Sequence, residues 1–120
     1  KRLVLMAVFS VVFCQGAGAQ AQTIQDLLYH YDKSGTRDKL LVKKQFGDIG
    51  DGLRWANMAL AEQEGAKPLY CLPPGVTLTR DNYFTLFRRH AEKNPAELDL
   101  PESEKGRILL LELQRTFRCK

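Results

Sequence analysis

The sequence has few of the residues on which catalytic and metal sites depend. Its 120 residues include three cysteines and two histidines. Neither His30 nor His90 lies at ligand spacing from a cysteine, which argues against a zinc site. No serine stands in a nucleophile elbow, and neither histidine has a carboxylate at catalytic spacing. We therefore expect a protein that is not an enzyme, needs no metal or cofactor, and keeps both histidines as half-buried structural residues.

Long apolar runs are also scarce, and the one near the N-terminus, residues 3–13, is shorter than the roughly 20 residues of a spanning helix. It follows Lys1 and Arg2 and precedes small residues, which is the three-part layout of a secretory signal peptide. We therefore expect residues 1–21 to be a signal peptide and residues 22–120 to be one periplasmic domain that does not bind the membrane.

Two details of this export signal stay open. Cleavage after Ala19 and cleavage after Ala21 both close a small–x–small pattern. A lipoprotein with Cys14 as the lipidated residue is the alternative, although Phe13 is bulky where a small residue is needed.

A concentrated patch of one charge is missing as well. The chain has 18 Lys and Arg against 14 Asp and Glu, and its basic residues are scattered or paired within helical patterns. This distribution argues against a nucleic-acid partner.

The two cysteines of the mature domain, Cys71 and Cys119, are 48 positions apart. An oxidising compartment permits a disulfide between them, and closing such a loop stabilises a small domain by about 4 kcal/mol in the chain-entropy model. We expect this bond, with two free thiols as the alternative.

Apolar residues recur at helical rather than strand spacing throughout the mature domain. Thr23 and Thr79 stand where helix N-caps are expected. The sequence predicts an all-α fold, a small four-helix domain stapled by one disulfide, with helices over about 23–32, 39–64, 79–93 and 101–117.

The second predicted helix contains Gly47, Gly50 and Gly52, each of which costs about 1 kcal/mol relative to alanine within a helix. We expect a neighbouring helix or a second subunit to approach closely at these glycines. Trp55 lies away from the apolar stripe of the same helix, so it lies either on a binding surface or under another helix.

The connection over residues 94–104 holds the densest acidic run of the chain and two prolines. We hypothesise that it presents Glu97, Asp99 and Glu102 to a partner protein. The alternative binding surface is the exposed side of the glycine-containing helix, around Asp51 and Trp55.

Four sequence motifs follow one another along the mature domain. They are the glycine-spaced helix Phe46-Gly47-Asp48-Ile49-Gly50-Asp51-Gly52, the motif Tyr70-Cys71-Leu72-Pro73, a helix that ends near Asn94-Pro95, and the C-terminal motif Phe117-Arg118-Cys119. In these features the chain resembles the Rap/Tai family of type VI secretion amidase-immunity proteins, over most of the mature domain.

The resemblance implies a small helical periplasmic protein, often a homodimer, that binds a peptidoglycan amidase effector and blocks its active site. It transfers no individual contact residue, because the matching motifs are structural. The alternative function is a small periplasmic helical chaperone or envelope-stress module with no toxin partner.

Overall fold

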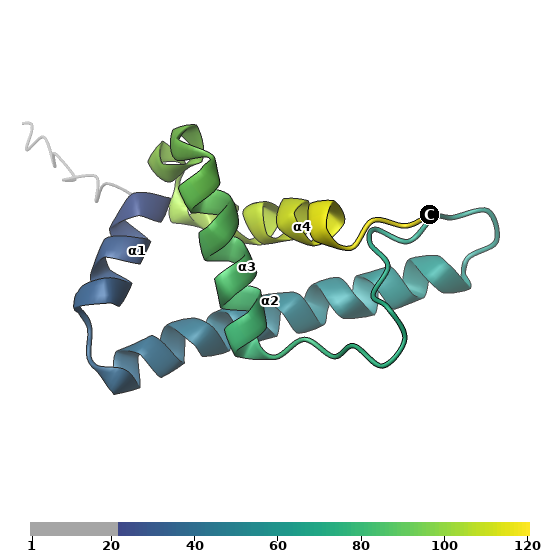
Figure 1. Cartoon of the computed structure of the whole chain (residues 1–120), viewed down its shortest axis with the longest axis horizontal. Coiled ribbons are helices and arrows are strands. Elements are labelled where there is room, and N and C mark those ends of the chain that lie inside the picture. The colour runs from purple at the N-terminus through teal and green to yellow at the C-terminus, as the bar shows by residue number, and fades with distance from the viewer. Residues whose placement is uncertain (1–21) are drawn as a thin grey trace, which may run out of the picture.

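The computed structural model describes residues 22–120, so the predicted signal peptide and Cys14 lie outside the described residues. The described chain forms four α-helices and two short 3₁₀ turns, and no strand is found within it (Figure 1). The elements are α1 (Ile24–Lys33), α2 (Thr36–Glu62), α3 (Arg80–Lys93), η1 (Pro95–Asp99), η2 (Glu102–Glu104) and α4 (Lys105–Thr116). The predicted all-α, four-helix fold is confirmed.

The helix starts follow the side chains that cap them. Thr23 and Asp26 form a capping box at α1, and Thr79 and Asn82 form another at α3. Helix α2 begins at Thr36, before the predicted start at about residue 39, although its N-cap Gly35 offers no side-chain hydrogen bond. Helix α4 begins later than predicted because residues 102–104 form the separate turn η2.

The core is built where α3 packs between the other helices. Phe46 of α2 is fully buried, with its ring centroid 4.4 Å from that of Phe87 and 5.4 Å from that of Phe84. Helix α4 contributes three apolar residues with no exposed surface, Ile108, Leu109 and Leu113. Helix α4 is thus central to the core, as its apolar composition predicts.

Two of the three helix glycines permit close packing of α3 on α2. A Cβ atom built on Gly50 would lie 2.4 Å from the Tyr83 ring, and one on Gly47 would lie 3.0 Å from Cβ of Arg80. A Cβ on Gly52 would meet no atom within 4 Å. The expected close approach is therefore confirmed at Gly47 and Gly50, and the approaching element is a helix of the same chain.

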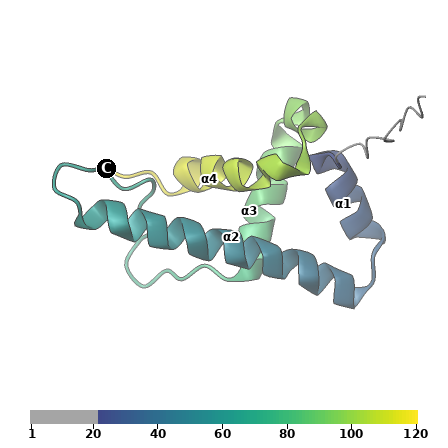
Figure 2. The same cartoon turned by 180° about the vertical axis from the view of Figure 1, so that it is seen from behind.

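A disulfide between Cys71 and Cys119 joins the segment after α2 to the C-terminus, as predicted, with an S–S distance of 2.02 Å. The backbone N–H of Cys71 also donates to the carbonyl of Phe117 at 2.8 Å. Figures 1 and 2 both show α4 running alongside the second half of α2 and the C-terminus meeting this segment. None of the helices formed by residues 22–120 is long and apolar enough to cross a membrane.

Candidate functional site

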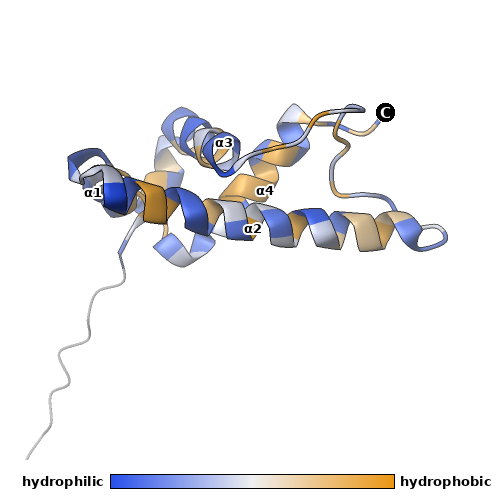
Figure 3. Cartoon of the chain, turned by 90° about the horizontal axis from the view of Figure 1, so that it is seen from below, coloured by the Kyte–Doolittle hydropathy of each residue, from blue (hydrophilic) through white to orange (hydrophobic). Residues whose placement is uncertain are grey.

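The side of α2 that points away from the core carries five exposed residues at helical spacing, which we call the outer face of α2: Asp48, Asp51, Trp55, Met58 and Glu62. Phe46 and Gly50, on the opposite side, are buried against α3. Figure 3 shows apolar residues interleaved with hydrophilic ones along α2. The helix therefore presents a mixed apolar and charged surface to solvent, and Lys44 and Arg54 add basic groups beside this face.

Trp55 is the most exposed large apolar side chain in the described chain, at 61%, and Met58 is 43% exposed. The interpretation that another helix covers Trp55 is wrong, because this large exposed fraction leaves no room for a covering helix. The guanidinium of Arg54 lies 5.0 Å from the centre of the Trp55 ring, within cation–π range. The contact leaves most of the indole exposed to water.

The carboxylates of the outer face differ in their neighbours. Lys44 donates to Asp48 at 2.9 Å, but both side chains are largely exposed, so the pair adds little stability. Burial raises the pKa of the Tyr83 hydroxyl, and the negative charge of Asp51 raises it further. Asp51 therefore lies near the point where α3 crosses α2, and Asp48 and Asp51 line one cavity there.

The acidic connection is more ordered and less exposed than the sequence predicts. Its backbone is tied to the N-terminal end of the domain, where Ile24 N–H donates to Leu100 O at 2.9 Å and Glu102 N–H donates to Gln22 O at 2.7 Å. The expectation of presented carboxylates is wrong for two of its residues. Glu102 accepts from Lys105 Nζ at 2.7 Å, and Glu97 is mostly buried against His90. Asp99 alone of the three predicted residues is exposed.

A buried ion cluster joins α3 to α4, and sequence reasoning missed it. Glu112 has no exposed surface and accepts hydrogen bonds from Arg89 Nε at 2.6 Å and Arg115 Nε at 2.9 Å. Arg115, then Arg89 and His90, lower the pKa of Glu112 to about 2 against the opposing effect of burial. The available signal was a lone glutamate inside the apolar arc of α4, between Leu109 and Leu113.

The two histidines have different environments. His90 is mostly buried, as predicted, with Nδ1 3.1 Å from Oε2 of Glu112 and Nε2 3.0 Å from Oε2 of Glu97. The fold thus places Glu97 and Glu112 beside the His90 ring, two contacts that the spacing in the sequence did not predict. His30 is exposed on α1, so the prediction that it is half-buried is wrong.

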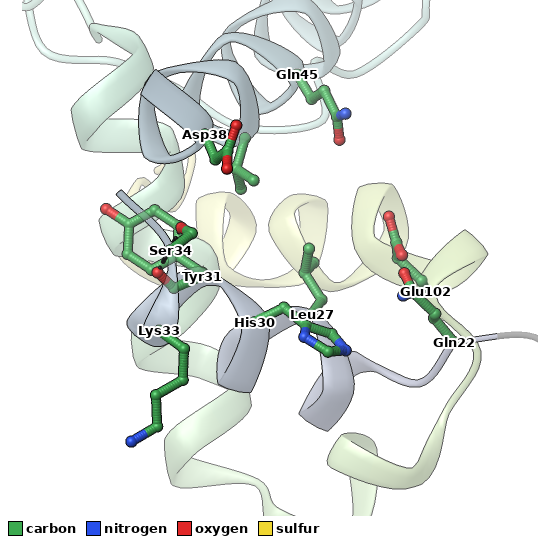
Figure 4. A pocket seen from close by; sticks show the side chains of 10 residues that line it. Gln22, Leu27, His30, Tyr31, Lys33, Ser34, Asp38, Gln45 and Glu102 are labelled. Atoms are coloured by element: carbon green, nitrogen blue, oxygen red, sulfur yellow. Dashed lines mark hydrogen bonds between the residues drawn. The ribbon is translucent and has the colours of Figure 1, made fainter. Parts of the chain in front are cut away.

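An open cavity of about 500 Å³ lies between α1 and the first half of α2, and Figure 4 shows the side chains that line it. Leu27 and Val42 supply apolar surface, while Asp38 and Gln45 come from α2 and Glu102 from η2. Within residues 22–120, no group of three or more His, Cys, Asp or Glu side chains is placed to hold a metal ion. His30, Lys33 and Ser34 of the α1 end also line the cavity, and the Ser34 hydroxyl donates to the Tyr31 carbonyl at 2.9 Å.

The outer face of α2 is therefore the candidate binding surface, because it combines an exposed aromatic ring with a rigid support. In comparisons with protein-family models, curated proteins and solved structures, the chain matched none. The resemblance to the Rap/Tai family thus stays a prediction from the residues, as do the assignments of Asp51 and Trp55 to a partner interface.

Proposed function

We propose that this chain is a periplasmic binding protein that neutralises a peptidoglycan amidase effector, as a type VI secretion immunity protein. The resemblance to the Rap/Tai family suggests the amidase. The single structural observation that supports a binding role is Trp55, which is 61% exposed beside Met58 on a rigid helix. Tryptophan is enriched among the few residues that dominate interface energies, and exposed apolar patches mark docking sites.

The chemistry of the outer face suggests how it engages a partner. Trp55 and Met58 would fill an apolar depression at the centre of the interface, and Asp48, Asp51 and Glu62 would form an acidic rim. Lys44 offsets Asp48, so Asp51 and Glu62 supply the negative charge of the rim, which would accelerate association with a basic surface and make the rate sensitive to salt. We therefore expect the amidase to present basic residues around its contact site.

Contacts that fix the second half of α2 before binding lower the entropy that is lost when a complex forms. Asn57 Nδ2 donates to Tyr70 O at 2.8 Å, and its Oδ1 accepts from the N–H of Tyr70 at 3.2 Å, so the returning chain is fixed to the second half of α2. The Cys71–Cys119 bond holds the same segment to the C-terminus. A surface that is ordered before binding loses less conformational entropy when the complex forms.

The test begins with the neighbouring genes, where we expect one for a small peptidoglycan amidase, and its product is then titrated with this chain; the absence of such a gene would favour the alternative function below. Release of peptides from purified peptidoglycan is followed while the mature chain is added in increasing molar ratio. We expect cleavage to stop near a one-to-one ratio of subunits. Undiminished cleavage at a large excess of the chain would refute the proposal.

The alternative function, a periplasmic chaperone or envelope-stress module, is supported by the same exposed side chains, because apolar surface also binds unfolded chains. Light scattering from an aggregating unfolded protein separates the two functions. Suppression of aggregation without inhibition of the amidase would favour the chaperone. A homodimer, which the resemblance also implies, is a further proposal that sedimentation velocity tests.

A further inference from the structure

The exposed side of α2 continues beyond the outer face toward the N-terminus of the helix. Four more exposed residues lie there at helical spacing, and we call them the N-terminal stripe: Arg37, Leu40, Leu41 and Lys44. At 100° per residue, Arg37 and Trp55 point in the same direction, whereas the buried Phe46 points in the opposite one. The N-terminal stripe and the outer face therefore form one continuous side of α2, about 37 Å long between Arg37 and Glu62.

Both halves of this side carry large apolar side chains in contact with water. Leu40 and Leu41 are 44% and 52% exposed, and Trp55 and Met58 on the outer face are exposed to a similar extent. Four of the six large apolar side chains that are exposed within residues 22–120 thus lie on one side of one helix. Such a concentration of apolar surface is typical of a protein interface.

The unpaired charges along α2 change sign from one end to the other. Lys43, Lys44 and Asp48 take part in ion pairs, whereas the other charged residues between positions 33 and 67 form none within residues 22–120. They are Lys33, Arg37 and Lys39 with Asp38 near the N-terminal end, and Asp51, Glu62 and Glu64 with Arg54 and Lys67 near the second half. Bases outnumber acids at the first end and acids outnumber bases at the second, and the helix dipole has the same polarity.

We propose that two copies of the chain pair through this side of α2, with their two α2 helices antiparallel. A two-fold axis places the N-terminal stripe of each copy on the outer face of the other, so every contact occurs twice. Arg37 then approaches Glu62 of the second copy, and Leu40 and Leu41 cover its Trp55. Parallel pairing would instead bring like charges together.

The pairing makes one further consequence follow, which rests on the proposed function. Because a second copy covers Trp55, it occupies the surface that the amidase would bind. The dimer and the complex with the amidase therefore exclude each other, and the dimer is the form of the chain that exists without the toxin.

The fluorescence of Trp55 reports the pairing, because it is the only tryptophan of the chain. The mature chain with its disulfide intact is diluted from about 500 µM to about 1 µM, and its mass is followed by sedimentation. We expect a dimer that dissociates with a Kd on the order of 20 µM, with an emission maximum at shorter wavelength in the dimer. A monomer at about 500 µM, or a dimer with unchanged emission, overturns the proposal.

Charge exchange tests which residues meet across the interface. Arg37→Glu and Glu62→Arg should each raise the dimer Kd about 10-fold, because each places like charges together twice. The double variant with both substitutions restores the opposite charges, and its Kd should lie within about 3-fold of the wild type. Lys93→Glu is the matched control, since Lys93 is exposed on α3, and its Kd should not change. Failure of the double variant to recover would refute the Arg37–Glu62 contact.

Distances between spin labels test the orientation of the helices. Nitroxides are attached to Gln45→Cys near the middle of α2, or to Gln63→Cys at its C-terminal end, both of which are exposed in the single chain. In the antiparallel dimer the two labels at position 45 should lie under about 30 Å apart and those at position 63 about 40 Å apart. Labels at position 63 that lie as close as those at position 45 would show parallel pairing and overturn the proposal.

Addition of the amidase separates the two proposals. We expect the distance between the labels at position 45 to disappear as a complex with one copy of each protein forms. A complex in which this distance persists would refute the competition. A monomeric chain that still inhibits the amidase would refute the pairing alone, and a dimer that does not inhibit it would refute the proposed function alone.

Discussion

The substitution Glu112→Gln removes the negative charge on which the α3–α4 cluster depends. Each carboxylate oxygen of Glu112 accepts from two side chains within 3.1 Å: Oε1 from Arg89 and Arg115, Oε2 from His90 and Arg115. A glutamine of the same shape retains one acceptor oxygen and turns an amide N–H₂ group toward donors. The variant therefore replaces charge-assisted hydrogen bonds by weaker or repulsive contacts.

The size of the expected loss in unfolding free energy follows from the lowered pKa of the Glu112 carboxyl. The pKa of Glu112 falls from its ordinary 4.5 to about 2, which corresponds to about 3 kcal/mol of differential stabilisation of the charged form. Arg89 and Arg115 are 39% and 47% exposed, so water can solvate them after the substitution. We therefore expect Glu112→Gln to lower the unfolding free energy by about 2 kcal/mol near pH 7.

The pH dependence has a definite sign. Because the folded-state pKa of Glu112 is depressed, its stabilisation is present above pH 4.5 and is lost as the pH falls through about 2. Urea unfolding of the wild type and of Glu112→Gln at about pH 7 and about pH 2.5 measures this pH dependence. The difference between their unfolding free energies should shrink strongly at the lower pH. The control Glu104→Gln, in an exposed pair with Arg107, should cost under about 0.5 kcal/mol. Equal stabilities of wild type and Glu112→Gln near pH 7 would refute the reasoning.

Thermal melts test two further parts of the fold. Gly50→Ala should destabilise the chain by about 1–3 kcal/mol, because its Cβ would overlap the Tyr83 ring, whereas Gly52→Ala, with open space around it, should be neutral or stabilising. Equal melting temperatures for these two variants would contradict the packing of α3 on α2. Cys71→Ser opens a loop of sequence separation 48 and should cost about 4 kcal/mol in the chain-entropy model. An unchanged melting temperature would show that the helices hold without the disulfide.

The sequence predicts the parts of this fold that depend on local patterns. Helical spacing and the caps at Thr23 and Thr79 define the helices, and the two mature cysteines define the disulfide. The glycines at 47 and 50 indicate a close helix contact because a mid-helix glycine needs a compensating interaction. The helical spacing, the caps and the glycines are each read from a few neighbouring residues, and two cysteines allow one disulfide pairing.

Contacts between distant segments could not be predicted in the same way. Glu112 meets His90 from 22 positions away, and Glu97 folds back onto the same ring. The acidic run at 94–104 therefore resembles a free loop in the sequence, although Glu97 lies against His90 and Glu102 accepts a hydrogen bond from Lys105. The exposure of Trp55 depends on which side of α2 is covered by α3 and α4, and helical spacing alone leaves that choice open.

The measurement that tests the proposed function most directly is the affinity of the amidase for the variant Trp55→Ala. Tyr29→Ala is the matched control, since Tyr29 is 59% exposed but lies on α1. We expect Trp55→Ala to raise the Kd by about 30-fold, corresponding to about 2 kcal/mol, while Tyr29→Ala binds as the wild type does. Wild-type affinity in Trp55→Ala, with both variants folded, would show that the outer face of α2 does not bind the amidase.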